Sequence, residues 1–273
     1  MRIARGDFAD FGATRDAATI ESPWHSETHV IEQSRRHDRA ADRGQSPLDP
    51  ESVLIPDRVP VFPLPQVVLF PRAVLPLHVF EQRYREMTGD ALAGDGFMAV
   101  ALLKPGFEAL YYTLRAPIHP VVGVGKIVAS EKLDDGRFNI LLQGLARMRI
   151  AQEESGELAY RVARVERLAA AGVLSPACER EIRAGLKKAL RELLGLPSEL
   201  LAHWLELCDA NLPLGDTVDL IASGLSCDAE LRQCLLAEAC AMNRACALRE
   251  QLATLGALCR QRMRRTQRGD CSN

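Results

Sequence analysis

Short apolar runs broken by proline fill residues 59–77 of the chain. Proline fixes φ and has no backbone N–H, so prolines at this density exclude a helix and confine strands to edges, ends or bulges. Residues 80–92 then predict one helix, and Gly94 predicts where it stops. The apolar contacts expected for that helix are Tyr84, Met87 and Leu92. A near-continuous apolar run at 97–103 predicts a buried strand.

A β-hairpin is the clearest local signal. Residues 121–133 lead into Asp134-Asp135-Gly136, whose Asp-Gly pair suits positive backbone angles at a tight turn. In the return strand, large apolar residues at the even positions of 138–143 predict a packed face, and the odd positions, ending at Gln143, predict a face toward water. A last strand is expected at 160–168. Many short strands, one helix and proline-marked edges predict a small closed or nearly closed barrel.

After residue 169 the apolar period becomes helical. Ser175-Pro176 provides a cap and first turn, and an apolar stripe then runs to Leu194, before Gly195 ends the helix. Further helices are predicted at 198–210 and 216–223, followed by one long helix from 228 towards 265 with a strongly basic end. Its expected inner positions are Leu231, Leu235, Met242, Cys246, Leu252, Leu255 and Cys259. These segments predict an α-helical bundle.

The chain is therefore expected to have an α+β fold with two structured parts. The barrel is predicted over 56–169 and the bundle over 175–265. Residues 1–52 are polar and charge-mixed with few aliphatic side chains, so a disordered tail is expected there, and a second one at 266–273.

Composition narrows the function. A formal net charge of -2 and an aromatic content of 5% argue against a nucleic-acid partner or an anionic membrane surface. We find no uncharged apolar run near the roughly 20 residues that span a bilayer, and no signal-peptide pattern at the amino terminus. The expected location is the cytoplasm.

The residues that commonly bind metals do not form a metal pattern. All eight cysteines follow residue 177, without a CxxC pair or Cys/His metal spacing, so reduced, passive thiols are expected. His25 and His29 are spaced i, i+4 in the predicted tail with His37 nearby, but a metal site needs a rigid frame. We expect no metal and no cofactor.

Catalytic motifs fail on chemical grounds. Gly123-Val124-Gly125-Lys126 resembles the end of a phosphate-binding loop, yet the first required glycine is Pro120 and the hydroxyl position is Ile127. Ser130 and Lys132 are close in sequence but lack an activating context and an oxyanion site. We expect no catalytic residues.

The order of prolines, apolar triplets and turn residues across 59–149 resembles the amino-terminal substrate-binding domain of the Lon protease family. The helical part supports the likeness, and together the resemblance covers about 56–255. The matching motifs are Val59-Pro60-Val61-Phe62-Pro63-Leu64-Pro65, Phe80-Glu81-Gln82-Arg83-Tyr84, Asp134-Asp135-Gly136-Arg137-Phe138, Pro213-Leu214-Gly215-Asp216-Thr217 and Gln233-Cys234-Leu235-Leu236.

The resemblance implies a twisted, PUA-like pseudo-β-barrel with one helix, followed by a helical bundle. It also implies a domain that binds unfolded or tagged protein segments and delivers them to an ATPase, in protein quality control. The family's ATPase and protease segments have no counterpart in this sequence, so the expected protein is a stand-alone, non-catalytic module, related to peptidase family S16 in name only.

Two sets of residues are candidate client contacts. Glu81, Arg83 and Tyr84 match the family's Phe-Glu-x-Arg-Tyr stretch and could shape a client groove, or instead cap the helix, pair locally and pack on the barrel. The second set, in a predicted loop, is Phe107, Leu110, Tyr111 and Tyr112. That loop is either an exposed peptide contact or a cover over the barrel mouth.

Three functions follow from this sequence. The first is binding of unfolded or exposed hydrophobic segments, in a groove between barrel and bundle. The second is an adaptor or regulator that docks on a separate ATP-dependent protease or chaperone through the long basic-ended helix. The third, RNA binding, is disfavoured by the charge and the few aromatic residues.

Overall fold

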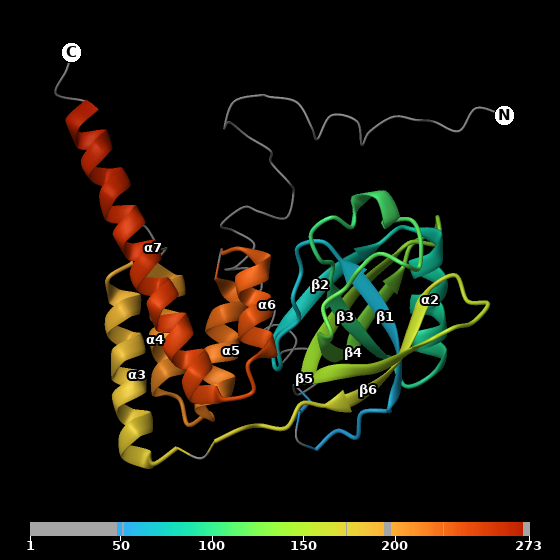
Figure 1. Ribbon diagram of the computed structural model, residues 1–273, viewed down its shortest axis with the longest axis horizontal. Helices are drawn as coiled ribbons and strands as arrows, with labels where there is room; N and C mark the ends of the chain where they lie inside the picture. Colours follow the sequence, from blue (N-terminus) through green and yellow to red (C-terminus); the bar gives the residue numbers. More distant parts are fainter. Residues whose placement is uncertain (1–47, 51, 173, 194–197, 226, 270–273) are drawn as a thin grey trace.

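The computed structural model describes residues 48–50, 52–172, 174–193, 198–225 and 227–269. Most of the predicted amino-terminal tail, with His25, His29 and His37, lies outside these residues, as do Gly195 and residues 270–273. In the described part a barrel is followed by a group of helices that lies beside it (Figure 1). The predicted α+β fold class is confirmed.

Six strands form the barrel within the described residues. They are β1 (Arg58–Leu64), β2 (Val74–Val79), β3 (Phe97–Leu102), β4 (Val121–Lys132), β5 (Phe138–Glu154) and β6 (Arg161–Arg167). Their order is β2-β5-β4-β3-β1-β6, and an additional β5–β6 pairing closes the sheet into a ring. The first half of β5 pairs with β2 and its second half with β6. The closed barrel expected from the sequence is confirmed.

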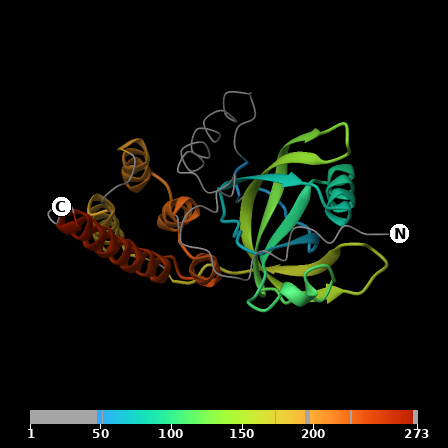
Figure 2. The ribbon, with the colours of Figure 1, turned by 90° about the horizontal axis from the view of Figure 1, so that it is seen from above.

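Helix α2 (Gln82–Ala93) packs on the barrel on the side away from the bundle (Figure 2). Tyr84 and Met87 are buried as predicted, whereas Leu92 is exposed and Ala91 takes the inner position. On the opposite face of the strands, apolar side chains, most of them alanine and valine, form a second buried set, which we call the alanine–valine cluster. It consists of Val59, Val61, Phe97, Ala99, Ala101, Val122, Val124, Leu145, Ala146, Met148, Ala163 and Val165.

Glycines in β4 and β5 admit another backbone against the sheet. A Cβ added to Gly123 would lie 1.9 Å from the carbonyl oxygen of Leu69, and one added to Gly144 would lie 2.0 Å from that of Phe70. Both distances are far below van der Waals contact, so only glycine fits. The glycines that suggested a phosphate loop are therefore strand residues, as the sequence analysis expected.

The predicted hairpin turn is present between β4 and β5. Gly136 has φ of 81°, Leu133 N donates to Arg137 O at 2.8 Å, and Asp135 does not share the positive angle. The prediction that Gln143 of β5 faces water is wrong, because this residue is only 3% exposed. Its amide is covered by an earlier part of the chain that sequence periodicity could not place there.

Five helices follow in the described residues: α3 (Pro176–Arg191), α4 (Ser198–Asp209), α5 (Leu214–Gly224), α6 (Ala229–Ala237) and α7 (Ala241–Gly269). Ser175 caps α3 as predicted, because its hydroxyl accepts from the backbone N–H of Cys178.

The prediction of a single long helix from residue 228 is wrong. The structure has two helices there, α6 and α7, which are separated by residues 238–240. The Glu238 carboxylate accepts from Cys240 N at 2.7 Å, and Arg244 donates to the carbonyls of Glu238 and Ala239. These bonds satisfy the backbone at the break. The break also resets the helical register, which leaves Met242 exposed instead of inside.

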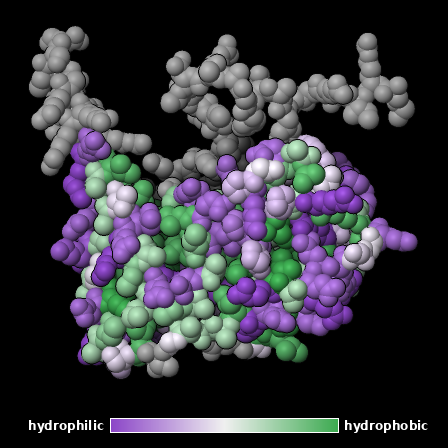
Figure 3. All heavy atoms as spheres, in the orientation of Figure 1, coloured by the Kyte–Doolittle hydropathy of each residue, from purple (hydrophilic) through white to green (hydrophobic). Residues whose placement is uncertain are grey.

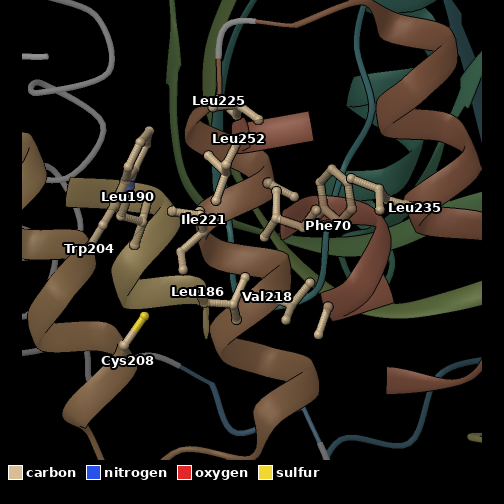
Figure 4. Close-up of a cluster of buried hydrophobic side chains, with 14 of the residues drawn as sticks. Phe70, Leu186, Leu190, Trp204, Cys208, Val218, Ile221, Leu225, Leu235 and Leu252 are labelled. Carbon is tan, nitrogen blue, oxygen red and sulfur yellow. The ribbon is translucent and has the colours of Figure 1, made fainter. Parts of the chain in front are cut away.

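A buried apolar cluster joins the bundle to the barrel. Phe70, Val68, Leu102 and Val121 of the barrel belong to the same cluster as the inner faces of α3–α7. Figure 4 shows Phe70 among the helical side chains of that cluster. Burial on this scale fixes the two parts against each other. On the face drawn in Figure 3, hydrophobic and hydrophilic residues are interspersed over both parts.

Candidate peptide-binding site

The loop between β3 and β4, residues 104–117, carries the predicted aromatic residues, and we call it the aromatic loop. An isolated bridge between Leu103 and Ile118 closes its base, and Lys104 N donates to Pro117 O at 2.8 Å. Buried Arg161 of β6 donates to Ala116 O at 2.6 Å. The loop is therefore a fixed projection from the barrel.

The two predicted sets of site residues meet at the start of α2. The Tyr111 hydroxyl donates to Glu81 Oε1 at 2.9 Å, and Arg83 Nη2 donates to the Tyr111 carbonyl at 3.1 Å. Arg83 also pairs with Glu81 at 3.0 Å, and its guanidinium lies 5.4 Å from the centre of the Tyr111 ring. Glu81 occupies the N-cap position of α2, but its carboxylate bonds these partners and not the helix backbone.

The pKa values of Tyr84 and Tyr111 are raised at this position. Burial, with the nearby Glu81 carboxylate, raises the pKa of Tyr111 well above its ordinary value. Burial raises the pKa of Tyr84 to about 12. The Tyr84 ring packs 4.4 Å from that of Phe62, and its buried hydroxyl has no hydrogen-bond partner among the described residues. Both phenols are neutral at physiological pH.

Apolar side chains project outward around this fixed centre. Tyr112 is 70% exposed with its ring 5.1 Å from Tyr111, and Leu110 and Leu114 are each 40% exposed. Phe107 is half-buried, with its ring 5.9 Å from Tyr111. Figure 3 shows hydrophobic atoms among hydrophilic ones near the top of the barrel, where Figure 1 places the loop.

The structure thus divides the predicted residues into two roles. The residues that support the aromatic loop are Glu81, Arg83, Tyr84 and Tyr111. The residues that face outward are Leu110 and Tyr112, and half-buried Phe107 lies beside them. Sequence reasoning missed Phe80, which is 63% exposed and precedes Glu81 directly. Its place in the Phe-Glu-x-Arg-Tyr motif was visible, but the sequence analysis treated Phe80 only as the first residue of the predicted helix.

Charged residues fix the contact between barrel and bundle. Asp219 of α5 is 1% exposed, and its Oδ1 lies 2.7 Å from Arg147 of β5 and 3.3 Å from Arg244 of α7. Arg147 also donates to Leu236 O at 3.0 Å. We call Asp219, Arg147 and Arg244 the junction ion group.

We also searched the part of the chain that the structure describes for a metal site, a membrane-spanning helix and a reactive thiol. It contains no cluster of three or more His, Cys, Asp or Glu side chains able to hold a metal, and none of its helices is long and apolar enough to cross a membrane. Burial raises the pKa of the Cys208 thiol to about 11, which keeps that thiol protonated and unreactive.

A family model described as the ATP-dependent protease La (LON) substrate-binding domain matches residues 58–254, more than half of the chain. The chain belongs to this family. The match covers all six described strands and continues into α7.

The relatives of this chain include proteins named as Lon proteases. The chain is 30% identical over 182 residues to a Lon protease of Anaeromyxobacter dehalogenans, covering 67% of this chain and 21% of that protein. It is also 30% identical over 182 residues to Lon protease 2 of Myxococcus xanthus, covering 67% and 22%. The chain therefore spans about a fifth of the length of these relatives.

Solved structures share the fold of this Lon substrate-binding domain. A Lon N-terminal domain protein from Xanthomonas campestris aligns with a TM-score of 0.50 and 21% identity, over 72% of this chain and 97% of that one. The N-terminal domain of a Mycobacterium avium complex Lon protease aligns with a TM-score of 0.54 and 20% identity, over 72% and 98%. At these identities the likeness concerns the fold.

Proposed function

We propose that this chain is a non-catalytic module that binds unfolded or exposed hydrophobic protein segments. Its membership of a family described as substrate-binding supports a protein ligand in general. The observation that carries the finer proposal is the aromatic loop, in which apolar side chains project from a rigid, hydrogen-bonded support.

The geometry suits an extended apolar segment. Tyrosine and phenylalanine offer large contact areas with few rotatable bonds, so binding a client costs them little side-chain entropy. The Glu81–Arg83–Tyr111 contacts fix the loop before a client arrives, which lowers the cost further. Clients that must order on binding should bind with micromolar or weaker affinity.

This proposal places the site on the loop and not in the expected groove between barrel and bundle. The interface between those parts holds the buried cluster around Phe70, and exposed large apolar residues occur at Phe80 and on the aromatic loop. Gly123 and Gly125 lie inside β4 against the backbone of other segments, so this stretch is a strand and not a phosphate-binding loop.

The test uses a permanently unfolded protein, reduced and carboxymethylated α-lactalbumin, carrying a fluorescent label. Fluorescence anisotropy would measure its affinity for the full chain and for the double variant Leu110→Ala/Tyr112→Ala. Truncating contact side chains of this kind costs about 1–2 kcal/mol, so we expect roughly 5- to 30-fold weaker binding. Native α-lactalbumin should not bind.

The matched control is Leu258→Ala, which removes a comparably exposed leucine from α7, far from the loop. It should bind like the unmodified chain. Equal affinities for the loop variant and the unmodified chain would refute the loop as the site, and no binding of the unfolded protein at all would refute the function.

The alternative function is that of an adaptor for an ATP-dependent protease or chaperone. The observation in its favour is α7, which at 29 residues extends past the other helices and carries exposed Leu258 (Figure 1). Recovery of one stoichiometric ATPase from lysate, lost on Leu258→Asp and retained by the loop variant, would favour this alternative.

A further inference from the structure

The residues just before the family match pack against the barrel. Residues 48–50 and 52–57, which we call the strap, precede β1. Leu48, Val53 and Ile55 pack against the alanine–valine cluster, and Pro50 is buried. The family model begins at residue 58, so these contacts lie outside the part of the chain that the model matches.

A buried side-chain amide binds the strap through its backbone. Gln143 of β5 donates from Nε2 to the Leu48 carbonyl at 2.8 Å and accepts from the Leu48 N–H at 3.1 Å. Both groups of one residue's main chain are thus satisfied by one glutamine. A buried amide without partners costs about 1–3 kcal/mol, so this position favours an occupant that offers a peptide donor and acceptor.

This contact is sequence-tolerant by its chemistry. Every residue except proline offers the same N–H and C=O pair, so the glutamine recognises extended backbone and the neighbouring apolar surface selects aliphatic side chains. Backbone recognition combined with an apolar surface suits the binding of unfolded segments of varied sequence.

We propose that the barrel surface around Gln143 is a binding site for an extended aliphatic peptide, and that the chain's own strap occupies it as a competing, autoinhibitory segment. The inference rests on the proposed function, since it names a second client contact and its regulation. The occupant is an aliphatic segment such as Leu48–Ile55 itself, not a charged or aromatic one.

The strap is held in a manner that permits displacement. Its described backbone bonds to the barrel are the Gln143 pair and the Val165 N–H to Asp57 O bond at 2.7 Å, which lies at its junction with β1. Arg72 pairs with Asp49 at 3.5 Å, a partly exposed contact of small energy. Leu54 is 92% exposed, so part of the strap contributes no burial.

The experiment uses the full chain and a fluorescein-labelled synthetic peptide of residues 46–57 as probe. Val53→Asp puts a charge against the alanine–valine cluster and should release the strap, while Leu54→Asp adds the same charge at the exposed neighbour. A tethered segment this close has an effective concentration of roughly millimolar, so Val53→Asp should bind the peptide about tenfold or more tightly than the unmodified chain. Leu54→Asp should bind like the unmodified chain.

A second variant guards against simple loss of folding. Leu48→Pro removes the N–H that donates to Gln143 and leaves all barrel residues in place. It should also bind the peptide more tightly, with an unchanged circular dichroism spectrum. If folded Val53→Asp and Leu48→Pro bind the peptide no better than Leu54→Asp, the strap is only part of the fold and the proposal is overturned.

The same variants separate this inference from the proposed function. Tighter peptide binding by Val53→Asp, with no binding of unfolded α-lactalbumin by any form, would uphold the peptide site and refute the general client function. Equal binding of the peptide by all forms, with unfolded α-lactalbumin bound through Tyr112, would uphold the function and overturn the strap site.

Discussion

Replacing Asp219 by Asn should destabilise the protein strongly, because it removes the only negative charge of the junction ion group. Asp219 is 1% exposed and lies between Arg147 and Arg244, whose side chains are 12% and 5% exposed. Burial raises the pKa of the Asp219 carboxyl, and the two guanidinium groups oppose that rise. The substitution keeps the shape of the side chain and removes its charge.

The expected loss is about 3–5 kcal/mol of unfolding free energy, the usual result of leaving a buried charge without its partner. For a chain of this size each kcal/mol lowers Tm by about 2–4 °C, so the fall should be roughly 6–20 °C. Urea and thermal denaturation followed by circular dichroism would measure both.

The matched control is Asp216→Asn, which lies three residues before Asp219 on α5 and is partly exposed in its pair with Arg72. A pair of this kind contributes about 0–1 kcal/mol, so the control should change little. If Asp219→Asn matched this control, Asp219 would be uncharged in the folded protein and the role assigned to the ion group would be refuted.

The carbonyl oxygen of Phe70 lies where a Cβ on residue 144 would be. Gly144→Ala should therefore lower the free energy of unfolding by about 1–3 kcal/mol or more, as measured by urea denaturation. Gly89→Ala in α2, where an added Cβ meets nothing within 4 Å, should instead stabilise by about 0.5–1 kcal/mol, and similar effects of both would contradict the packing argument. Tyr84 has a folded pKa of about 12 against an ordinary 10, so the unfolded chain loses this proton first and stability falls as pH rises from 10 to 12, by at most about 2–3 kcal/mol. Tyr84→Phe should be neutral or slightly stabilising at pH 7 and should flatten that alkaline decline, whereas an unchanged decline would assign it to other groups.

Local patterns were sufficient for most of the fold. The prolines of β1 and β2, the glycine turn at Gly136 and the Ser175 cap each act through a few neighbouring residues, so the sequence contains the information directly. Helical periodicity likewise located α3, α4 and α5 within a few residues.

Errors arose where side-chain contacts that the periodicity does not encode accompany the observed structure. Gln143 is buried because Leu48, 95 residues away, covers it, and strand alternation contains no information about such a partner. The predicted long helix is interrupted between Ala237 and Ala241, where Glu238 and Arg244 bond the backbone, although the helical period of the sequence continues through the break.

In the candidate site, too, local patterns indicated the residues, whereas their contacts became clear only from the structure. The sequence supplied Glu81, Arg83 and Tyr111 as separate candidates, but their contact depends on how the aromatic loop folds back on α2. Whether Tyr111 or Tyr112 is exposed could not be decided from two adjacent, identical residues. The structure resolves this because one hydroxyl reaches Glu81 and the other ring projects outward.

Amide hydrogen exchange with and without reduced, carboxymethylated α-lactalbumin is the most direct test of the proposed client contact. Bound client should slow exchange in the aromatic loop, residues 104–117, and at the start of α2. It should leave exchange in the carboxyl-terminal part of α7 unchanged. Protection confined to α7, or no protection under conditions where the complex forms, would contradict binding of unfolded segments through the aromatic loop.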